Sequence, residues 1–133
     1  MSADACLVVT PYSNRPRPKG ILAHYQALDE VGLPFILYDI PSRTSMELGV
    51  ELIMKLCESC HSIVGLKASN GNLDEITEII YRSTQFGWPF SVFSGDDSLT
   101  LPTLAVEGVG VISVAVRGCI SNSGKTDDIN PIN

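Results

Sequence analysis

Lys67 closes an otherwise apolar run, SIVGLKAS (62–69), and small polar residues follow it. Desolvation at the mouth of a buried strand disfavours a charged ammonium group, and the free amine is a nucleophile toward carbonyl carbon. A lysine at this position can instead extend its ammonium to solvent or pair with a carboxylate. The position alone favours neither interpretation, so the neighbouring segments must decide between them.

Two further side chains could act with this lysine. Tyr38 lies near the end of the preceding apolar run, PFILYDI (34–40). Residues at matching depth in adjacent parallel strands can face one pocket, where a phenol could relay protons to an imine. For a tyrosine considered alone, we favour a half-buried ring with a solvated hydroxyl. Arg43, in the following loop, carries a planar fork that suits a carboxylate, although surface arginines in loops are common.

The elements that position these residues follow from the hydrophobic pattern. Five short segments are rich in β-branched residues and apolar on both faces, which is typical of parallel strands covered on both sides. They are 5–12, 34–40, 62–69, 90–96 and 108–115. Helical patterns lie between them, at about 18–31, 45–59, 73–86 and 99–106. The chain therefore alternates strand and helix.

Capping residues are predicted at the starts of two helices. Thr44 with Glu47, and Asn72 with Glu75, have the spacing of a capping box, in which the first side chain accepts from a backbone N–H of the first turn. Both pairs stand directly before a helical pattern. The helices are therefore expected to begin soon after the preceding strands end.

The segment SGDD (94–97) follows the fourth predicted strand. It is a turn and helix start in the simpler interpretation, with Asp97 or Ser98 as the helix cap. Gly95 and Asp96 could also leave room for a ligand at the end of the strand. We therefore count Gly95 among the candidate substrate-binding residues.

The strand ends are evenly spaced. Thr10, Tyr38, Lys67 and Gly95 are 28, 29 and 28 residues apart, which is one β-α unit each. Such units build either a doubly wound sheet or a (β/α)8 barrel. No G-x-G-x-x-G motif follows the first strand, which disfavours dinucleotide binding. Because polar residues gather at the carboxyl ends of the strands, where barrels keep their active sites, we predict an α/β fold of the TIM barrel type.

The barrel is predicted to be partial. A complete one needs about 250 residues and eight strands, whereas this chain has 133 residues and five predicted strands, about strands four to eight. We expect the barrel domain over 1–115 and a divergent, loosely ordered tail over 116–133, where helical periodicity is lost. Five barrel strands leave two sheet edges unpaired, so a second copy or a missing half is the expected partner.

Composition excludes several function classes. The net charge is −6 and the nine Lys and Arg residues are scattered, which argues against a nucleic acid partner. No apolar run approaches the about 20 residues of a membrane span, and the first residues lack the pattern of a signal peptide. We expect a cytoplasmic protein that binds neither nucleic acid nor membrane.

Five motifs, in this order and spacing, resemble the dihydrodipicolinate synthase (4-hydroxy-tetrahydrodipicolinate synthase) family of pyruvate-dependent, class I aldolase-type barrel enzymes. They are VTPYSNRP, ILYDIPSRT, GLKAS, FSGDD and GVGVISV. The resemblance covers about residues 3–115. It implies a lyase that condenses pyruvate with aspartate semialdehyde in diaminopimelate and lysine biosynthesis.

The resemblance also implies a role for each matching residue. Lys67 matches the lysine that forms a Schiff base with pyruvate, so neither a metal nor a separate cofactor is expected. Tyr38 matches the proton-relay tyrosine, and Arg43 matches the carboxylate-binding arginine. Ile112 matches the residue whose backbone carbonyl faces bound pyruvate. Tyr12 corresponds to an interface tyrosine near the site where lysine inhibits some members.

The chain departs from the family pattern in three places. Ser13 stands where the family has a second tyrosine, which reaches into the neighbouring subunit's site. The first three strands, with a threonine pair that holds the pyruvate carboxylate, are absent, and the sequence after Ala115 diverges. Two alternatives therefore stand beside the synthase: a catalytically silent truncated fragment or interaction module, and another pyruvate aldolase such as a sugar-acid lyase.

Overall fold

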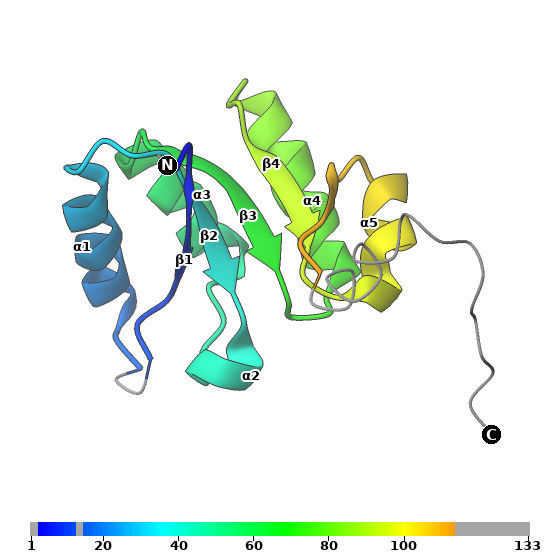
Figure 1. Cartoon of the computed structure of the whole chain (residues 1–133), viewed down its shortest axis with the longest axis horizontal. Coiled ribbons are helices and arrows are strands. Elements are labelled where there is room, and N and C mark those ends of the chain that lie inside the picture. The colour runs from blue at the N-terminus through cyan, green and yellow to red at the C-terminus, as the bar shows by residue number, and fades with distance from the viewer. Residues whose placement is uncertain (1–2, 13–14, 114–133) are drawn as a thin grey trace, which may run out of the picture.

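One parallel sheet forms the centre of the molecule. The computed structural model describes residues 3–12 and 15–113. Its strands pair in chain order (Figure 1), as β1 (Cys6–Val9), β2 (Phe35–Asp39), β3 (Ile63–Ala68), β4 (Ser91–Ser94) and β5 (Gly110–Val111). Each strand lies within its predicted range, so the prediction of five parallel strands is confirmed. The predicted tail over 116–133 lies outside the described residues.

Helices connect successive strands. They are α1 (Pro18–Asp29), α3 (Gly49–Ser59), α4 (Leu73–Gln85) and α5 (Thr100–Ala105), with two short additions, α2 (Pro41–Thr44) and the 3-10 helix η1 (Asp97–Leu99). Right-handed crossovers between neighbouring parallel strands keep the connecting helices on one face of the sheet. Accordingly α1 packs against α3, α3 against α4 and α4 against α5, and Figure 1 shows α3 and α4 behind the strands. None of the helices in the described residues is long and apolar enough to cross a membrane.

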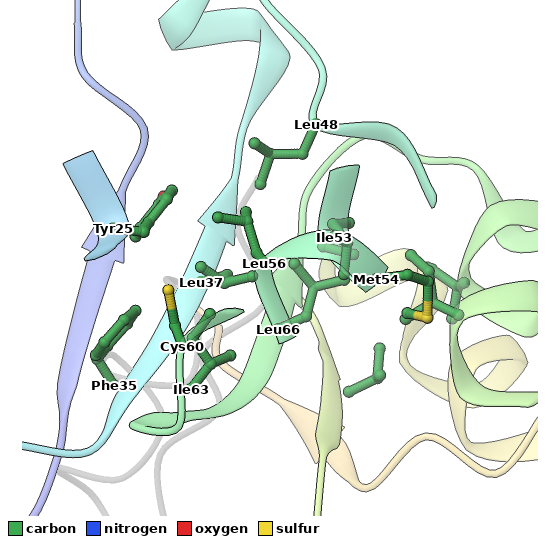
Figure 2. Packing of buried hydrophobic residues seen from close by; sticks show 14 of the residues in the cluster. Tyr25, Phe35, Leu37, Leu48, Ile53, Met54, Leu56, Cys60, Ile63 and Leu66 are labelled. Carbon is green, nitrogen blue, oxygen red and sulfur yellow. The ribbon is translucent and has the colours of Figure 1, made fainter. Parts of the chain in front are cut away.

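The hydrophobic core fills the space between the sheet and the helices. Leu37 of β2 and Leu66 of β3 are paired in register and face Leu56 of α3 (Figure 2). The rings of Tyr25 and Phe35 stack with their centroids 5.9 Å apart. All five side chains are almost completely buried. Burial of one large apolar side chain stabilises a fold by about 1.5–3 kcal/mol, so this layer holds the helices to the sheet.

One of the two predicted capping boxes is present. The side chain of Asn72 accepts from the backbone N–H of Glu75 at 3.2 Å and caps α4, as predicted. The capping box at Thr44 is wrong, because this threonine lies inside α2 and its single O–H is shared between the backbone carbonyls of Ile40 and Met46, at 3.1 and 2.9 Å. Leu48 precedes α3 instead, and no side chain caps that helix.

The cap after β4 is one residue earlier than predicted. The Asp96 carboxylate accepts from the backbone N–H of Ser98 at 2.9 Å and from its hydroxyl at 2.8 Å. Asp97 is already the first residue of η1, so the prediction of Asp97 or Ser98 as the cap is wrong. The 3-10 turn shifts the start of the helical segment because it inserts three residues before α5. The hydrogen bonds from Ser98 lower the pKa of Asp96.

Candidate active site

Lys67 and Tyr38 are brought together by the pairing of β2 with β3. The two residues are direct partners in the parallel register, so their side chains leave the sheet on the same face. The Nζ atom of Lys67 lies 4.3 Å from the centroid of the Tyr38 ring. Lys67 is 5% exposed, so it does not extend to bulk solvent, and Tyr38 is half-buried. The register of the two strands thus places a buried amino group over the face of a tyrosine ring.

Gly95 lies against the lysine side chain. A Cβ atom on Gly95 would lie 3.0 Å from Cε of Lys67, 3.0 Å from the carbonyl oxygen of Ala68 and 1.8 Å from Oγ of Ser69. Even a methyl group fits there only if the Ser69 hydroxyl rotates away and the Lys67 side chain and the Ala68 carbonyl shift by a few tenths of an ångström. The glycine at the end of β4 therefore leaves space for the lysine side chain itself.

Arg43 lies on α2, directly after β2. Figure 1 shows α2 at the carboxyl end of the sheet, beyond the arrowhead of β2. The side chain is exposed, and within residues 3–12 and 15–113 its guanidinium forms no ion pair. An unpaired guanidinium can bind a carboxylate with two parallel hydrogen bonds. Arg43 is thus on the same end of the sheet as Tyr38 and Lys67, although no contact joins it to them.

Ile112 and Tyr12 lie beyond the carboxyl ends of the two outermost strands. Ile112 follows β5 and is half-buried, and its N–H donates to the backbone carbonyl of Ser94 at 2.9 Å. Tyr12 lies three residues after β1 and is 60% exposed. The structure places both on the predicted end of the sheet, but the exposed ring of Tyr12 is not packed into the Lys67–Tyr38 pair.

Asp39 is a buried polar residue that the sequence reasoning did not single out. It follows Tyr38, points to the opposite face of the sheet and is 1% exposed. Its carboxylate accepts from the N–H of Leu48 at 3.3 Å and from the amide of Asn70 at 3.4 Å. Burial, with a further contribution from the charge of Glu47, raises its pKa to about 6. The available signal was an acidic residue at the end of an apolar strand.

Potential metal ligands were also sought in the described part of the chain. Carboxylate oxygens of Asp39, Glu47 and Glu75 lie within 4.8 Å of one another, and residues 3–12 and 15–113 contain no other such group. The amide nitrogen of Asn70 lies 3.4, 3.2 and 3.0 Å from them, respectively. Since these carboxylates have a protein donor, we assign no metal to them.

Cys57 and Cys60 have the C-x-x-C spacing found in redox and zinc sites, but they lie away from Lys67. Cys57 and Cys60 contribute to a cavity of about 370 Å³ beside Ile63 and Phe90, at the amino-terminal ends of β3 and β4. Burial raises the pKa of Cys57 to about 12 and that of Cys60 to about 11. Thiols with such values stay protonated at neutral pH, and the thiolate is the nucleophile and the metal ligand. The geometry supports a structural role for both cysteines.

Comparison with known proteins gives the same family over most of the chain. The model of the dihydrodipicolinate synthetase family matches residues 1–121. The chain is 48% identical over 116 residues to the 4-hydroxy-tetrahydrodipicolinate synthase of Aquifex aeolicus, which covers 86% of this chain and 38% of that protein. It is 49% identical over 113 residues to the synthase of Listeria monocytogenes, covering 84% of this chain and 37% of that one.

Solved structures of dihydrodipicolinate synthases are also similar to this chain. The dihydrodipicolinate synthase of Aquifex aeolicus superposes with a TM-score of 0.78 at 47% identity, over 85% of this chain and 38% of that one. The lysine-bound enzyme of Cyanidioschyzon merolae superposes with a TM-score of 0.78 at 43% identity. The match covers 84% of this chain and 37% of that enzyme. The chain thus spans about two-fifths of its relatives, and its five strands correspond to part of their TIM barrel. With the Lys67–Tyr38 pair at the carboxyl end of that sheet, the chain belongs to the dihydrodipicolinate synthetase family, whose members are lyases.

Proposed function

We propose that this chain carries the Schiff-base centre of a 4-hydroxy-tetrahydrodipicolinate synthase, with Lys67 as the nucleophile toward pyruvate. The supporting observation is that Nζ of Lys67, nearly excluded from solvent, lies 4.3 Å from the Tyr38 ring on the neighbouring strand. A buried amine beside a proton-transfer group is what imine formation requires. The names of the relatives support pyruvate and aspartate semialdehyde as the two substrates.

The chemistry can be assigned to residues of this chain. The Lys67 amine adds to the ketone carbon of pyruvate, and water leaves as the imine forms. Loss of a proton from the methyl carbon gives an enamine, whose carbon attacks the aldehyde of the second substrate. Tyr38 carries protons to and from the nitrogen and the leaving oxygen, because its phenol is the group beside the amine.

Three other residues are proposed to bind substrate. Arg43 binds the carboxylate of aspartate semialdehyde through its unpaired guanidinium. The backbone carbonyl of Ile112 faces bound pyruvate. Gly95 keeps the approach to Lys67 free, since any side chain there would meet Cε of the lysine. No metal or separate cofactor has a step in this reaction.

Borohydride trapping tests the nucleophile directly. The full chain is incubated with pyruvate and sodium borohydride, and its intact mass is measured. Condensation loses water and reduction adds two hydrogens, so a single adduct adds about 72 Da. Peptide mapping should place it on Lys67. Lys67→Ala should abolish the adduct, whereas Lys55→Ala on the exposed side of α3 should keep it. A wild-type mass that does not change with pyruvate rejects the proposal.

The proposed assembly is a homo-oligomer or a complex with a missing barrel half. In the described residues β1 and β5 each pair on one side alone, so both edges can accept another strand. Light scattering of the purified chain, alone and mixed with a polypeptide carrying the first three barrel strands, measures this. A monomer that neither self-associates nor binds that polypeptide, and that forms no pyruvate adduct, would instead be the catalytically silent fragment.

A second candidate is another pyruvate aldolase, such as a sugar-acid lyase. The family protein YagE of E. coli K12, solved in complex with pyruvate, superposes with a TM-score of 0.79 at 27% identity. Pyruvate binding is thus compatible with both candidates. They differ in the second substrate, the aldehyde that the enamine attacks. Condensation rates with aspartate semialdehyde and with sugar-derived aldehydes should be compared, and Arg43→Ala should reduce the former more.

We also propose a regulatory contact and a location. The relative from Cyanidioschyzon merolae was solved with lysine bound. We propose Tyr12, exposed at the end of β1, as an interface residue near a corresponding lysine site. The proposed location is the cytoplasm.

A further inference from the structure

Asp39 links three parts of the structure around the Schiff-base centre. Its backbone carbonyl accepts from the N–H of Ser69, two residues after Lys67, at 2.8 Å. One carboxylate oxygen accepts from Leu48 at 3.3 Å and the other from Asn70 at 3.4 Å. The bond to Leu48 closes the loop 40–48, which carries Arg43. Asp39 therefore fixes the end of β2, the end of β3 and the base of that loop.

The surroundings of Asp39 contain more acceptors than donors. Asn70 has two amide N–H groups, and three carboxylates lie within 3.0–3.4 Å of its nitrogen: those of Asp39, Glu47 and Glu75. With the Leu48 N–H, only three N–H groups face the six oxygens of these carboxylates, and oxygens from all three residues lie within 4.8 Å of one another. A proton shared among the carboxyl groups adds a donor and removes a repulsion between like charges.

The carboxylates of Asp39, Glu47 and Glu75 have no positively charged partner within residues 3–12 and 15–113. Among the residues that the structure describes, neither Lys, Arg nor His forms an ion pair with Asp39, Glu47 or Glu75. The Lys67 ammonium leaves the sheet on the other face. From α1, the Tyr25 phenol also faces Asp39, and burial, with a further contribution from the charge of Asp39, raises the pKa of this phenol.

We propose that Asp39 is a positioning residue of the Lys67–Tyr38 site, held in its protonated form by its burial and by the charge of Glu47, and that its ionisation loosens loop 40–48 and displaces Tyr38. The catalytic consequence rests on the proposed function, but the structural step does not. Burial and Glu47 place the pKa of Asp39 at about 6, and burial with Glu47 and Asp39 places that of Glu75 at about 7. The transition thus falls between slightly acid and neutral pH.

Two NMR measurements on the full chain test the structural step. The ring signals of Tyr38 should shift with pH, with a midpoint near 6. The protection factor of the Leu48 amide, corrected for the intrinsic exchange rate, should fall about fourfold from pH 5.5 to 7.5. This is the linkage expected when opening of the loop exposes one carboxyl group whose pKa is about 6 in the closed form, and it includes the N–H bond from Leu48, which favours the ionised form. Constant ring signals and a constant protection factor over this range would overturn the proposal.

Three variants test whether Asp39 is the group whose ionisation causes these pH-dependent changes. Asp39→Asn stays neutral, keeps an acceptor for Leu48 and should abolish both pH dependences. Glu47→Gln removes a charge that raises the pKa of Asp39, so the midpoint should move to lower pH. Asp74→Asn is the matched control, because this residue is exposed on α4, and it should behave as wild type. A Glu47→Gln midpoint equal to that of wild type would contradict the role of shared protonation.

The effect of Asp39 on Lys67 is tested with the pyruvate–borohydride trapping reaction. The ratio of the adduct formation rates, Asp39→Asn over wild type, should rise several-fold from pH 5.5 to 7.5, since the variant keeps its loop closed. A constant ratio with pH-dependent NMR signals would reject the link to Lys67. If no variant forms an adduct at any pH, the proposed function fails, while the Tyr38 signals still decide whether Asp39 positions that ring.

Discussion

The ammonium nitrogen of Lys67 lies 4.3 Å from the centre of the Tyr38 ring, because the register of β2 and β3 makes the two residues direct partners. A cation above an aromatic face is attracted by the ring, more strongly where water is excluded. The same contact brings the phenol near the amine. One pairing therefore sets the positions of both the proposed nucleophile and its proposed proton-transfer group.

Removal of the Tyr38 hydroxyl should separate these two effects. Tyr38→Phe keeps the ring under the ammonium, so the pyruvate adduct on Lys67 should still form. Proton transfer should slow by about 10²-fold or more, the usual contribution of a positioned acid–base group. Exchange of the pyruvate methyl protons with deuterated water, followed by NMR, measures the step. Tyr81→Phe on the exposed side of α4 is the control, and an equal loss in both variants would contradict the assignment.

Gly95 should not tolerate alanine. The added Cβ would overlap Oγ of Ser69 and press on Cε of Lys67, so the lysine must move. Overpacking of this kind costs about 1–3 kcal/mol of unfolding free energy. We expect Gly95→Ala to be destabilised in urea and to lose most of its pyruvate trapping. Gly20→Ala on α1 should keep its trapping, and unchanged trapping in Gly95→Ala would show that the close approach is unimportant.

The fold was predictable because its signal is local and repeated. Each strand is a short apolar run, and the ends of the runs from Thr10 to Gly95 recur every 28 or 29 residues. Parallel strands in chain order then place Tyr38 beside Lys67 by geometry alone. The loop conformations were less predictable. Thr44 and Glu47 match a capping box in sequence. In the structure, however, Thr44 is the last residue of α2, and its hydroxyl bonds to the backbone carbonyls of Ile40 and Met46 instead of capping α3.

The surroundings of Asp39 could not be predicted from the sequence. Its neighbours Glu47, Asn70 and Glu75 come from a loop, a second loop and α4, up to 36 residues away along the chain. They meet Asp39 only because alternation along β2 turns that side chain toward the helices and Tyr38 toward the other face. A shift of one residue in the strand would have reversed the two roles.

The cap on α4 offers a test of local stability. The Asn72 side chain accepts from the N–H of Glu75 at 3.2 Å, so Asn72→Ala leaves this donor without its partner. The free energy of unfolding should fall by about 1 kcal/mol, whereas Asn72→Ser should recover most of it. Urea unfolding at pH 6 measures both. Equal stability of the alanine and serine variants would show that water replaces the cap.

Stability should fall as the pH rises from 5 to 8. The fold raises the pKa of Asp39 to about 6 and that of Glu75 to about 7, so the folded state binds more protons than the unfolded state in this range. The stabilisation is complete below the unfolded pKa values, near 4, and is lost as the pH passes 6 and 7. Carboxyls whose pKa is lowered, such as Asp96, act only below this window.

Asp39 is expected to lose about 1–2 kcal/mol of stabilisation between pH 5 and 8. Glu75 adds to this loss, but solvent screening reduces its share because the side chain is only half-buried. Urea unfolding at several pH values measures it. Asp39→Asn should flatten the profile, Glu75→Gln should reduce its slope near pH 7, and Asp74→Asn should leave it unchanged. A wild-type stability that does not change with pH across this window would mean that both carboxyls ionise in the fold with their ordinary pKa values, and that the N–H donors of Asn70 and Leu48 are enough to hold them together.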